Sequence, residues 1–128
     1  MPTLQLVKVN IPMPVVKLRF RGADHHFIVD TGAQGTMVDP DAIGVNQNTT
    51  LRPLGIGGVG GDQMSALAEV RFNFCGVTIN EMGLMLTLRQ ASLAYGVKLS
   101  GLIGQDILGQ FRQVIFDNDK HTVEFVPR

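Results

Sequence analysis

One aspartate stands where burial would make a carboxylate energetically costly. Asp30 follows the apolar run Phe27 to Val29 and is followed at once by Thr31 and Gly32. A carboxyl group at the end of a buried strand can give or take a proton in a reaction that involves water. The same residues are also ordinary turn material, because an aspartate side chain accepts hydrogen bonds from nearby backbone. Asp30 is therefore the first candidate for chemistry, with a structural turn as the alternative.

A second candidate is the glycine-rich stretch from Gly55 to Gly61. Gly55, Gly57 and Gly60 match the G-x-G-x-x-G spacing of a dinucleotide-binding loop. Such a loop needs a helix directly after the glycines, whereas the residues after Asp62 alternate as in a strand. We therefore favour the tip of a flexible β-hairpin, since glycine frees the backbone and offers no side-chain contacts. Nucleotide binding is the alternative.

Metal and disulfide chemistry are not expected. His25 and His26 point to opposite faces if they lie on a strand. Asp117 and Asp119 begin like a calcium loop, but the other ligands are missing, so a hairpin turn is expected there. The single cysteine, Cys75, can form neither an intrachain disulfide nor a cysteine zinc cluster. We expect no metal and no other cofactor.

Strands must position these candidates, because the main hydrophobic period is two. From Met64 to Phe74 every even position is apolar. Segments with strand-like composition elsewhere are Leu4 to Ile11, Val15 to Phe20, His26 to Val29, Val77 to Leu86, Gln113 to Phe116 and Thr122 to Val126. Asp106 to Phe111 is expected to be helical, and Leu88 to Tyr95 has room for a turn or two. The predicted fold class is mostly β, with one short helix near the C-terminus.

Length and composition fit a single domain over residues 1–128. The chain has 128 residues, 45% of them hydrophobic, with 11 basic and 11 acidic side chains. Balanced charge without a basic run argues against nucleic acid or an anionic membrane surface as a partner. No apolar stretch is long enough to span a membrane, and the first residues do not start a signal peptide. The compartment stays open.

The order of these features resembles the retropepsin-like aspartic proteases, the family that includes the retroviral proteases and bacterial members. The likeness rests on the apolar strand before Asp30-Thr31-Gly32, on Ala33 after it, on the glycine-rich hairpin, and on Gly101 to Gly104 ahead of a short helix. It covers nearly the whole chain, from Val15 to Val126. The resemblance implies a closed β-barrel of the acid protease type.

The resemblance also implies a role for each segment. Asp30 would be the catalytic aspartate, with Thr31 and Gly32 completing its turn. The glycine-rich hairpin would be a flap that closes over a peptide substrate. The residues that would contact this substrate, beside the turn and at the flap, are Ala33, Gln34, Ile56, Gly57, Gly58 and Val59.

The Asp-Thr-Gly motif occurs once, so a second carboxylate must come from another copy of the chain. Asp106 and Asp117 lack the following threonine and glycine, and neither is expected to be the partner. Two carboxylates about 3 Å apart would repel by roughly 5 kcal/mol at an effective dielectric constant of 20, so the pair keeps one proton and offers both an acid and a base. We expect a homodimer with Asp30 of each copy at the two-fold axis. The terminal strands, Leu4 to Ile11 and Thr122 to Val126, would then form part of the interface.

Gln34 and Gln105 depart from the retroviral pattern, in which the equivalent residues are acidic and basic. We expect a neutral hydrogen bond to replace the ion pair, between the two side chains or between one side chain and neighbouring backbone. The overall prediction is a homodimeric aspartic endopeptidase that acts on peptides or proteins. The alternative is a retropepsin-like domain that binds peptides or mediates dimerisation without cleaving.

Overall fold

The computed structural model describes residues 3–128 apart from 21, 41–51, 57–62, 75–76 and 86, and describes side chains outside residue 20 and residues 52–85. The elements are β1 (Thr3–Gln5), β2 (Val15–Phe20), β3 (Ala23–Val29), β4 (Met37–Val38), β5 (Arg52–Ile56), β6 (Gln63–Phe74), β7 (Val77–Met85), α2 (Arg89–Tyr95), β8 (Leu99–Ile103), α3 (Gln105–Leu108), β9 (Phe111–Asp117) and β10 (Thr122–Pro127). Strands dominate, so the mostly β prediction is confirmed. Among the described residues, none of the helices has the length and apolar character needed to cross a membrane.

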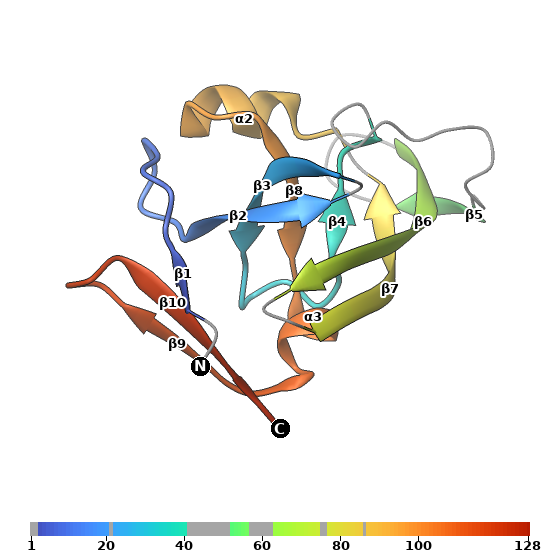
Figure 1. The fold of residues 1–128 in the computed structure, drawn as a ribbon. Helices are drawn as coiled ribbons and strands as arrows, with labels where there is room; N and C mark the ends of the chain where they lie inside the picture. The colour runs from blue at the N-terminus through green and yellow to red at the C-terminus, as the bar shows by residue number, and fades with distance from the viewer. Residues whose placement is uncertain (1–2, 21, 41–51, 57–62, 75–76, 86) are drawn as a thin grey trace.

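The strands form two sheets (Figure 1). The larger has the order β2-β3-β8-β4-β7-β6-β5, and the smaller has the order β1-β10-β9. Within the larger sheet β3 and β8 run parallel, with Val29 opposite Ile103. The carboxyl ends of two parallel neighbours lie at the same edge of a sheet. The loop after β3 and the helix after β8 therefore start side by side.

The larger sheet bends over itself without closing. β2 contacts β6, but β2 and β5 stand at the two ends of the strand order, and no ladder joins them in the described part of the chain. A barrel needs hydrogen-bonded pairing all the way round. The closed barrel expected from the sequence is therefore not observed.

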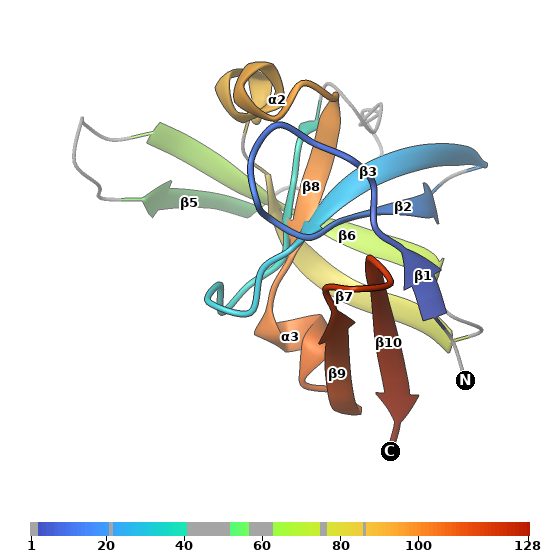
Figure 2. The same ribbon diagram turned by 90° about the vertical axis from the view of Figure 1, so that its left-hand side faces the viewer.

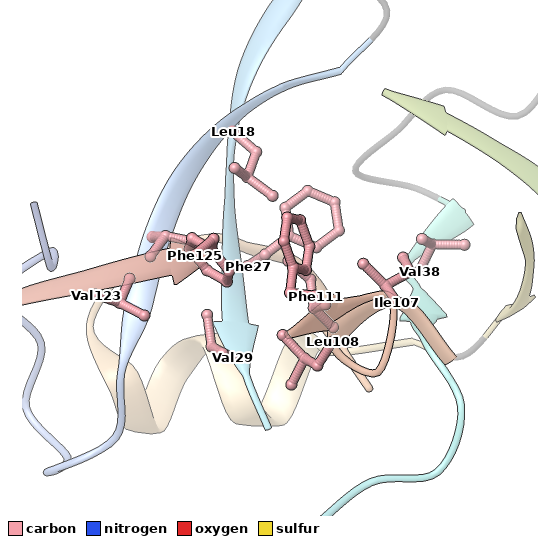
Figure 3. Packing of buried hydrophobic residues seen from close by; sticks show 11 residues of the cluster. Leu18, Phe27, Val29, Val38, Ile107, Leu108, Phe111, Val123 and Phe125 are labelled. Atoms are coloured by element: carbon pink, nitrogen blue, oxygen red, sulfur yellow. The ribbon is translucent and has the colours of Figure 1, made fainter. Parts of the chain in front are cut away.

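Side chains from both sheets and from α3 meet in the main core (Figure 3). Phe27 and Val29 come from β3, Ile107 from α3, and Phe125 from β10, and all four are buried. The rings of Phe111 and Phe125 pack with centroids 5.3 Å apart. Burying such a side chain stabilises the fold by about 1.5–3 kcal/mol. This core fixes β3 against α3 and against the smaller sheet.

The helices differ from the prediction in number and limits. α3 begins one residue before the predicted start and is shorter, because Phe111 already belongs to β9. α2 is a further helix, where only a turn or two was expected. It ends at Gly96, whose φ of 76° is a left-handed conformation that glycine adopts without strain. None of its residues is fully buried, so it has no strong apolar stripe in the sequence.

The N-terminal strand is much shorter than predicted. Only Thr3–Gln5 form β1, which pairs with β10 in the same chain, Leu4 opposite Val123. We call residues 6–14 the N-terminal arm. The arm loops toward α2 before it enters β2 (Figure 2). Pro12 and Pro14 have no N–H group, so a regular ladder cannot continue through them.

Single backbone hydrogen bonds hold the arm at four places, the last of them from Val29 N–H to the Pro14 carbonyl over 2.8 Å. Leu6 N–H donates to the His121 carbonyl over 2.7 Å, and Val7 N–H donates to that of Val15 over 2.7 Å. Asn10 N–H donates to the carbonyl of Tyr95, the last residue of α2, over 3.0 Å. The arm therefore has a fixed course between the β9–β10 turn and α2.

The turn between β9 and β10 is the hairpin turn that the sequence predicts. Oδ1 of Asp117 accepts hydrogen bonds from the backbone N–H groups of Asp119 and Lys120, both at 3.0 Å. His121 closes the turn with a φ of 53°, which is unusual for a residue with a side chain. Its carbonyl accepts hydrogen bonds from Leu6 N–H and from the side-chain amide of Gln5.

Candidate active site

Asp30 lies directly beyond the carboxyl end of β3, beside the end of β8. Its N–H donates to the Ile103 carbonyl over 3.0 Å, which continues the β3–β8 pairing by one residue. The chain then turns back, because Ala33 N–H donates to the Asp30 carbonyl over 3.2 Å. The Asp30 side chain is half-buried in a single copy of the chain. The aspartate is thus fixed by a strand behind it and by a turn ahead of it.

The turn also orients the carboxylate. Oδ1 of Asp30 accepts a hydrogen bond from Gly32 N–H over 3.0 Å. A Cβ atom at position 32 would lie 3.4 Å from the same oxygen, so glycine keeps this side of the carboxylate open. The Gly32 N–H therefore fixes the orientation of the Asp30 carboxylate.

The first residues of α3 hydrogen-bond to the loop that follows Asp30. Gln105 N–H donates to the Ala33 carbonyl over 2.8 Å, and Asp106 N–H donates to the Gln34 carbonyl over 3.0 Å. Gln105 also reaches the turn through its side chain, whose Nε2 donates to the Thr31 carbonyl over 2.9 Å. The expected neutral hydrogen bond at Gln105 therefore ends on the backbone of the turn, at Thr31 and not at Gln34.

A buried hydroxyl and a carboxylate make the strongest link between the loop and α3. Asp106 accepts from Thr36 twice, from its N–H at 3.0 Å and from its Oγ1 at 2.7 Å. Thr36 Oγ1 in turn accepts from Gly104 N–H at 3.2 Å. Thr36 is only 1% exposed, so these partners replace the water that its polar groups would otherwise bind.

This Thr36 to Asp106 link was not predicted from the sequence. The two residues are 70 positions apart, and Asp106 was considered only as a second catalytic aspartate. One feature of the sequence pointed to a structural role for Asp106. It precedes the apolar pair of a short helix, and acidic side chains favour the first turn of a helix. The structure makes Asp106 a positioning residue for the loop.

A pocket of about 510 Å³ opens beside Asp30. Its lining comes from the N-terminal arm, from Phe116 of β9 and from Asn118 and His121 of the following turn. Val29, Asp30 and Thr31 also line it. Most of the lining residues are apolar, so the Asp30 carboxylate borders a mainly apolar surface.

Tyr95 of α2 lies on the same side of the molecule, within reach of the Asp30 charge. Burial, and then the negative charge of Asp30, raise the pKa of Tyr95 above its ordinary value of 10.0. Its ring packs in a second apolar cluster around Val15, Ile28 and Leu99. α2 and the arm together therefore form a wall near Asp30.

The structure brings some of the predicted site residues together and leaves others undescribed. Asp30 to Ala33 form one turn, Gln34 follows it directly, and Ile56 ends β5. Gly57, Gly58 and Val59, the predicted tip of the flap, lie outside the described residues. The strands on either side, β5 and β6, are antiparallel, with Ile56 opposite Gln63. Because a strand and not a helix follows the glycines, the dinucleotide-loop alternative lacks its required context.

Comparison with known proteins decides the family. The model of the family described as retroviral aspartyl protease matches residues 11–115, which include Asp30, the β5–β6 hairpin and α3. The chain belongs to the retroviral aspartyl protease family. A search among curated protein sequences found no significant match.

A solved member of the fold agrees with this assignment. The structure of EIAV protease complexed with the inhibitor HBY-793 is similar to the chain, with a TM-score of 0.53 and 21% sequence identity. The match covers 76% of this chain and 86% of that protease. At this identity the likeness concerns the fold alone. The chain thus has the fold of a retroviral aspartyl protease and that family's motif at Asp30.

Proposed function

We propose that the protein is a homodimeric aspartic endopeptidase in which the Asp30 carboxyls of two copies activate one water molecule. The observation that carries this proposal is the fixed position of Asp30 beyond β3, with Gly32 N–H on its Oδ1 and α3 behind its loop. Family membership supports the reaction class. A second copy is required because the motif occurs once in the chain.

The reaction divides the work between the two carboxyls. The ionised carboxylate takes a proton from the water, whose oxygen attacks the peptide carbonyl carbon, while the protonated carboxyl gives its proton to the carbonyl oxygen. The tetrahedral intermediate then collapses as the C–N bond breaks and the nitrogen takes up a proton. The products are a carboxylic acid and an amine. Because the reaction needs one proton on the pair, its rate falls at pH values where the pair carries none or two.

Substrate contacts are proposed on both sides of the cleft. Thr31 and Gly32 complete the catalytic turn, and Ala33 and Gln34 follow it on the exposed loop. The β5–β6 hairpin would close over the peptide, with Ile56, Gly57, Gly58 and Val59 at its tip. A hairpin that closes on a substrate excludes water from the reaction.

The test is peptide-library digestion by the wild type and by Asp30→Asn. We expect Asp30→Asn to lose at least about 100-fold in cleavage rate, because an amide cannot exchange the proton. Sedimentation should show the same dimer for both. Asp119→Asn, an equivalent change on the exposed β9–β10 turn, is the matched control and should keep full activity. Full cleavage by Asp30→Asn would contradict the mechanism, and a wild type that dimerises and binds peptides without cleaving them would support the non-catalytic alternative.

A further inference from the structure

An apolar surface of the larger sheet begins beside the Asp30 carboxylate. Residues two apart along an extended strand point to the same side, so Ile28 and Asp30 share a face. Asp30 still follows the strand direction, because its N–H pairs with the Ile103 carbonyl of β8. Leu102 of β8 lies opposite Ile28. Ile28 is buried and Leu102 is only partly buried, so part of this surface is open to a bound molecule.

Tyr95, the last residue of α2, extends the same surface. Its ring and Leu102 both pack against the apolar cluster that contains Ile28. Burial raises the pKa of Tyr95, and the Asp30 charge raises it further. The phenol group therefore lies in the apolar cluster and within the electrostatic influence of the carboxylate.

The hydroxyl group of Tyr95 is available as a hydrogen-bond donor. Among the described residues it donates to no other group, and its side chain is half-buried. A tyrosine whose ring is packed among apolar side chains ordinarily keeps its hydroxyl paired. An apolar ring with an available hydroxyl beside a reacting centre is suited to recognise part of a substrate.

α2 holds Tyr95 in place because the helix is fixed at both ends. At its start, Oδ2 of the buried Asp39 accepts a hydrogen bond from Leu88 N–H over 2.8 Å. At its end, the Tyr95 carbonyl accepts from Asn10 N–H over 3.0 Å. A Cβ atom on Gly96 would come within 2.6 Å of the Asn10 side chain, so glycine lets the arm lie close to α2. A donor that is fixed before binding costs less conformational entropy when a ligand arrives.

This surface suits a side chain with an apolar stem and a neutral acceptor at its tip. The stem would pack on Ile28 and Leu102, and the tip would accept a hydrogen bond from the Tyr95 hydroxyl. Glutamine has both parts, since two methylene groups precede its amide oxygen. Glutamate has the same shape, but its carboxylate would meet the negative charge of the Asp30 pair, and like charges disfavour each other.

We propose that Tyr95 is a specificity-determining residue, whose hydroxyl donates a hydrogen bond to a neutral side-chain acceptor of the peptide substrate, glutamine above all, packed on Ile28 and Leu102. This inference rests on the proposed function, which places the peptide at Asp30. Each copy in a two-fold dimer carries the same surface. The preference for glutamine is therefore expected on both sides of the scissile bond.

Peptides that differ at one position, with glutamine, glutamate or leucine, test this proposal. The position is scanned through the residues that flank the scissile bond. In Tyr95→Phe the ratio of kcat/KM for the glutamine peptide to kcat/KM for the leucine peptide should fall roughly 3- to 10-fold, because one neutral hydrogen bond is lost. Leu93→Ala, on the same helix at a side chain that is 79% exposed, is the control and should keep the wild-type ratio.

The glutamate peptide tests the influence of the Asp30 charge. Wild type should cleave the glutamine peptide at least about 10-fold faster than the glutamate peptide above the ordinary glutamate pKa of about 4.3. The difference should narrow below that pH, where both side chains are neutral. Faster cleavage of the glutamate peptide above that pH would contradict the proposed choice of a neutral acceptor.

Binding of the same peptides to Asp30→Asn separates this inference from the catalytic proposal. Asp30→Asn should bind the peptides without cleaving them, and adding Tyr95→Phe should lower its preference for glutamine over leucine by a similar factor. Equal glutamine-to-leucine ratios in wild type and Tyr95→Phe at every scanned position would overturn the inference, as would an equal change in Leu93→Ala. A wild type that binds with the Tyr95-dependent preference but cleaves no peptide would overturn the catalytic proposal and leave this inference standing.

Discussion

At the residue scale, the contact between Thr36 and Asp106 ties the loop after Asp30 to α3. The Asp106 carboxylate accepts two hydrogen bonds from Thr36 and one from Ile107 N–H, the last at 2.9 Å. Hydrogen bonds to a charged acceptor are stronger than those between neutral groups, and Thr36 has no exposed surface from which to find water instead. The loop that carries Asp30 is thereby tied to α3 at a point six residues from the aspartate.

We expect Asp106→Ala to lower the free energy of unfolding by about 1–3 kcal/mol, because it leaves the buried polar groups of Thr36 without an acceptor. Thr36→Val should cost less, and the double variant should show a coupling energy on the order of 1 kcal/mol. Urea unfolding measures all three. Asp119→Ala, at an exposed aspartate, should stay within about 0.5 kcal/mol of the wild type. Additive losses at positions 36 and 106 would mean that the contact does not stabilise the loop.

Tyr95 gives a direct spectroscopic report on the charge at Asp30. The chain has one tyrosine and no tryptophan, so phenolate absorbance comes from Tyr95 alone. Burial and the Asp30 charge raise its pKa above 10.0 in the folded state. The unfolded chain therefore loses the phenol proton first, and the stability that Tyr95 contributes is complete below pH 10.0 and is lost as the pH rises through its folded pKa.

In Asp30→Asn the Tyr95 titration should move to lower pH and remain above 10.0, because burial still acts after the charge is removed. Tyr95→Phe should lessen the loss of stability at alkaline pH. Asp119→Asn keeps the Asp30 charge and should leave the titration in place. An identical titration curve in Asp30→Asn would show that the two side chains do not interact.

The residues of the Asp30 turn were predictable, whereas the contacts that support the turn were not. Asp30, Thr31 and Gly32 are contiguous, so the sequence shows them together. Gln105 was identified, with either the Gln34 side chain or neighbouring backbone expected as its partner, and the partner is the backbone carbonyl of Thr31. Contacts between positions some 70 residues apart depend on strand pairing, which a single sequence does not specify.

Among the structural elements, the loop after β3 and the start of α3 meet through two glycines. A Cβ atom on Gly104 would come within 2.6 Å of the backbone carbon and oxygen of Gly35, and within 3.0 Å of the Ala33 carbonyl. Backbone atoms cannot rotate away as the end of a side chain can. The close approach lets Gln105 and Asp106 donate their N–H groups to the loop.

Gly104→Ala should therefore destabilise the protein by roughly 1–3 kcal/mol or more, since an added methyl group forces the loop and α3 apart. Cleavage should fall further than stability alone explains, because Asp30 moves with the loop. Gly35→Ala is the matched control on the other side of the contact. A Cβ atom there would meet nothing within 4 Å, so this variant should be nearly neutral. Equal effects of the two substitutions in thermal unfolding and in cleavage would contradict the role of the contact.

Elements with a strict hydrophobic period were predicted well, whereas elements whose course is set by contacts with neighbouring elements were not. Val15–Phe20 was predicted with its observed limits, and Met64 to Phe74 lies within β6 one residue from its start. Leu4 to Ile11 was expected to be a strand because of its apolar residues, but the backbone bonds of the arm go to four separate partners. β4 is only two residues long, which is too short for a hydrophobic period to appear in the sequence. α2 has no buried residues, so no clear hydrophobic period marks it either.

At the scale of the whole molecule, the chain carries one Asp-Thr-Gly motif, so under the proposed function it supplies one half of a site. The family and the mostly β fold follow from the motif and from the order of elements, and both are confirmed. The closed barrel is not observed in the described part of the chain, where β2 and β5 stand at the two ends of the larger sheet; such closure is a long-range pairing that no local pattern encodes. The homodimer remains a proposal that rests on a single Asp-Thr-Gly motif per chain.

Mixing wild type with Asp30→Asn tests the shared site most directly. Subunits are exchanged at concentrations near the dimer dissociation constant, and cleavage is followed at a fixed total concentration. If each site needs one Asp30 from each copy, mixed dimers are inactive, and an equal mixture keeps only about a quarter of the wild-type rate because association is random. The rate should fall as the square of the wild-type fraction. A rate that falls in direct proportion to that fraction would show that each chain works alone, and would contradict the shared pair of aspartates.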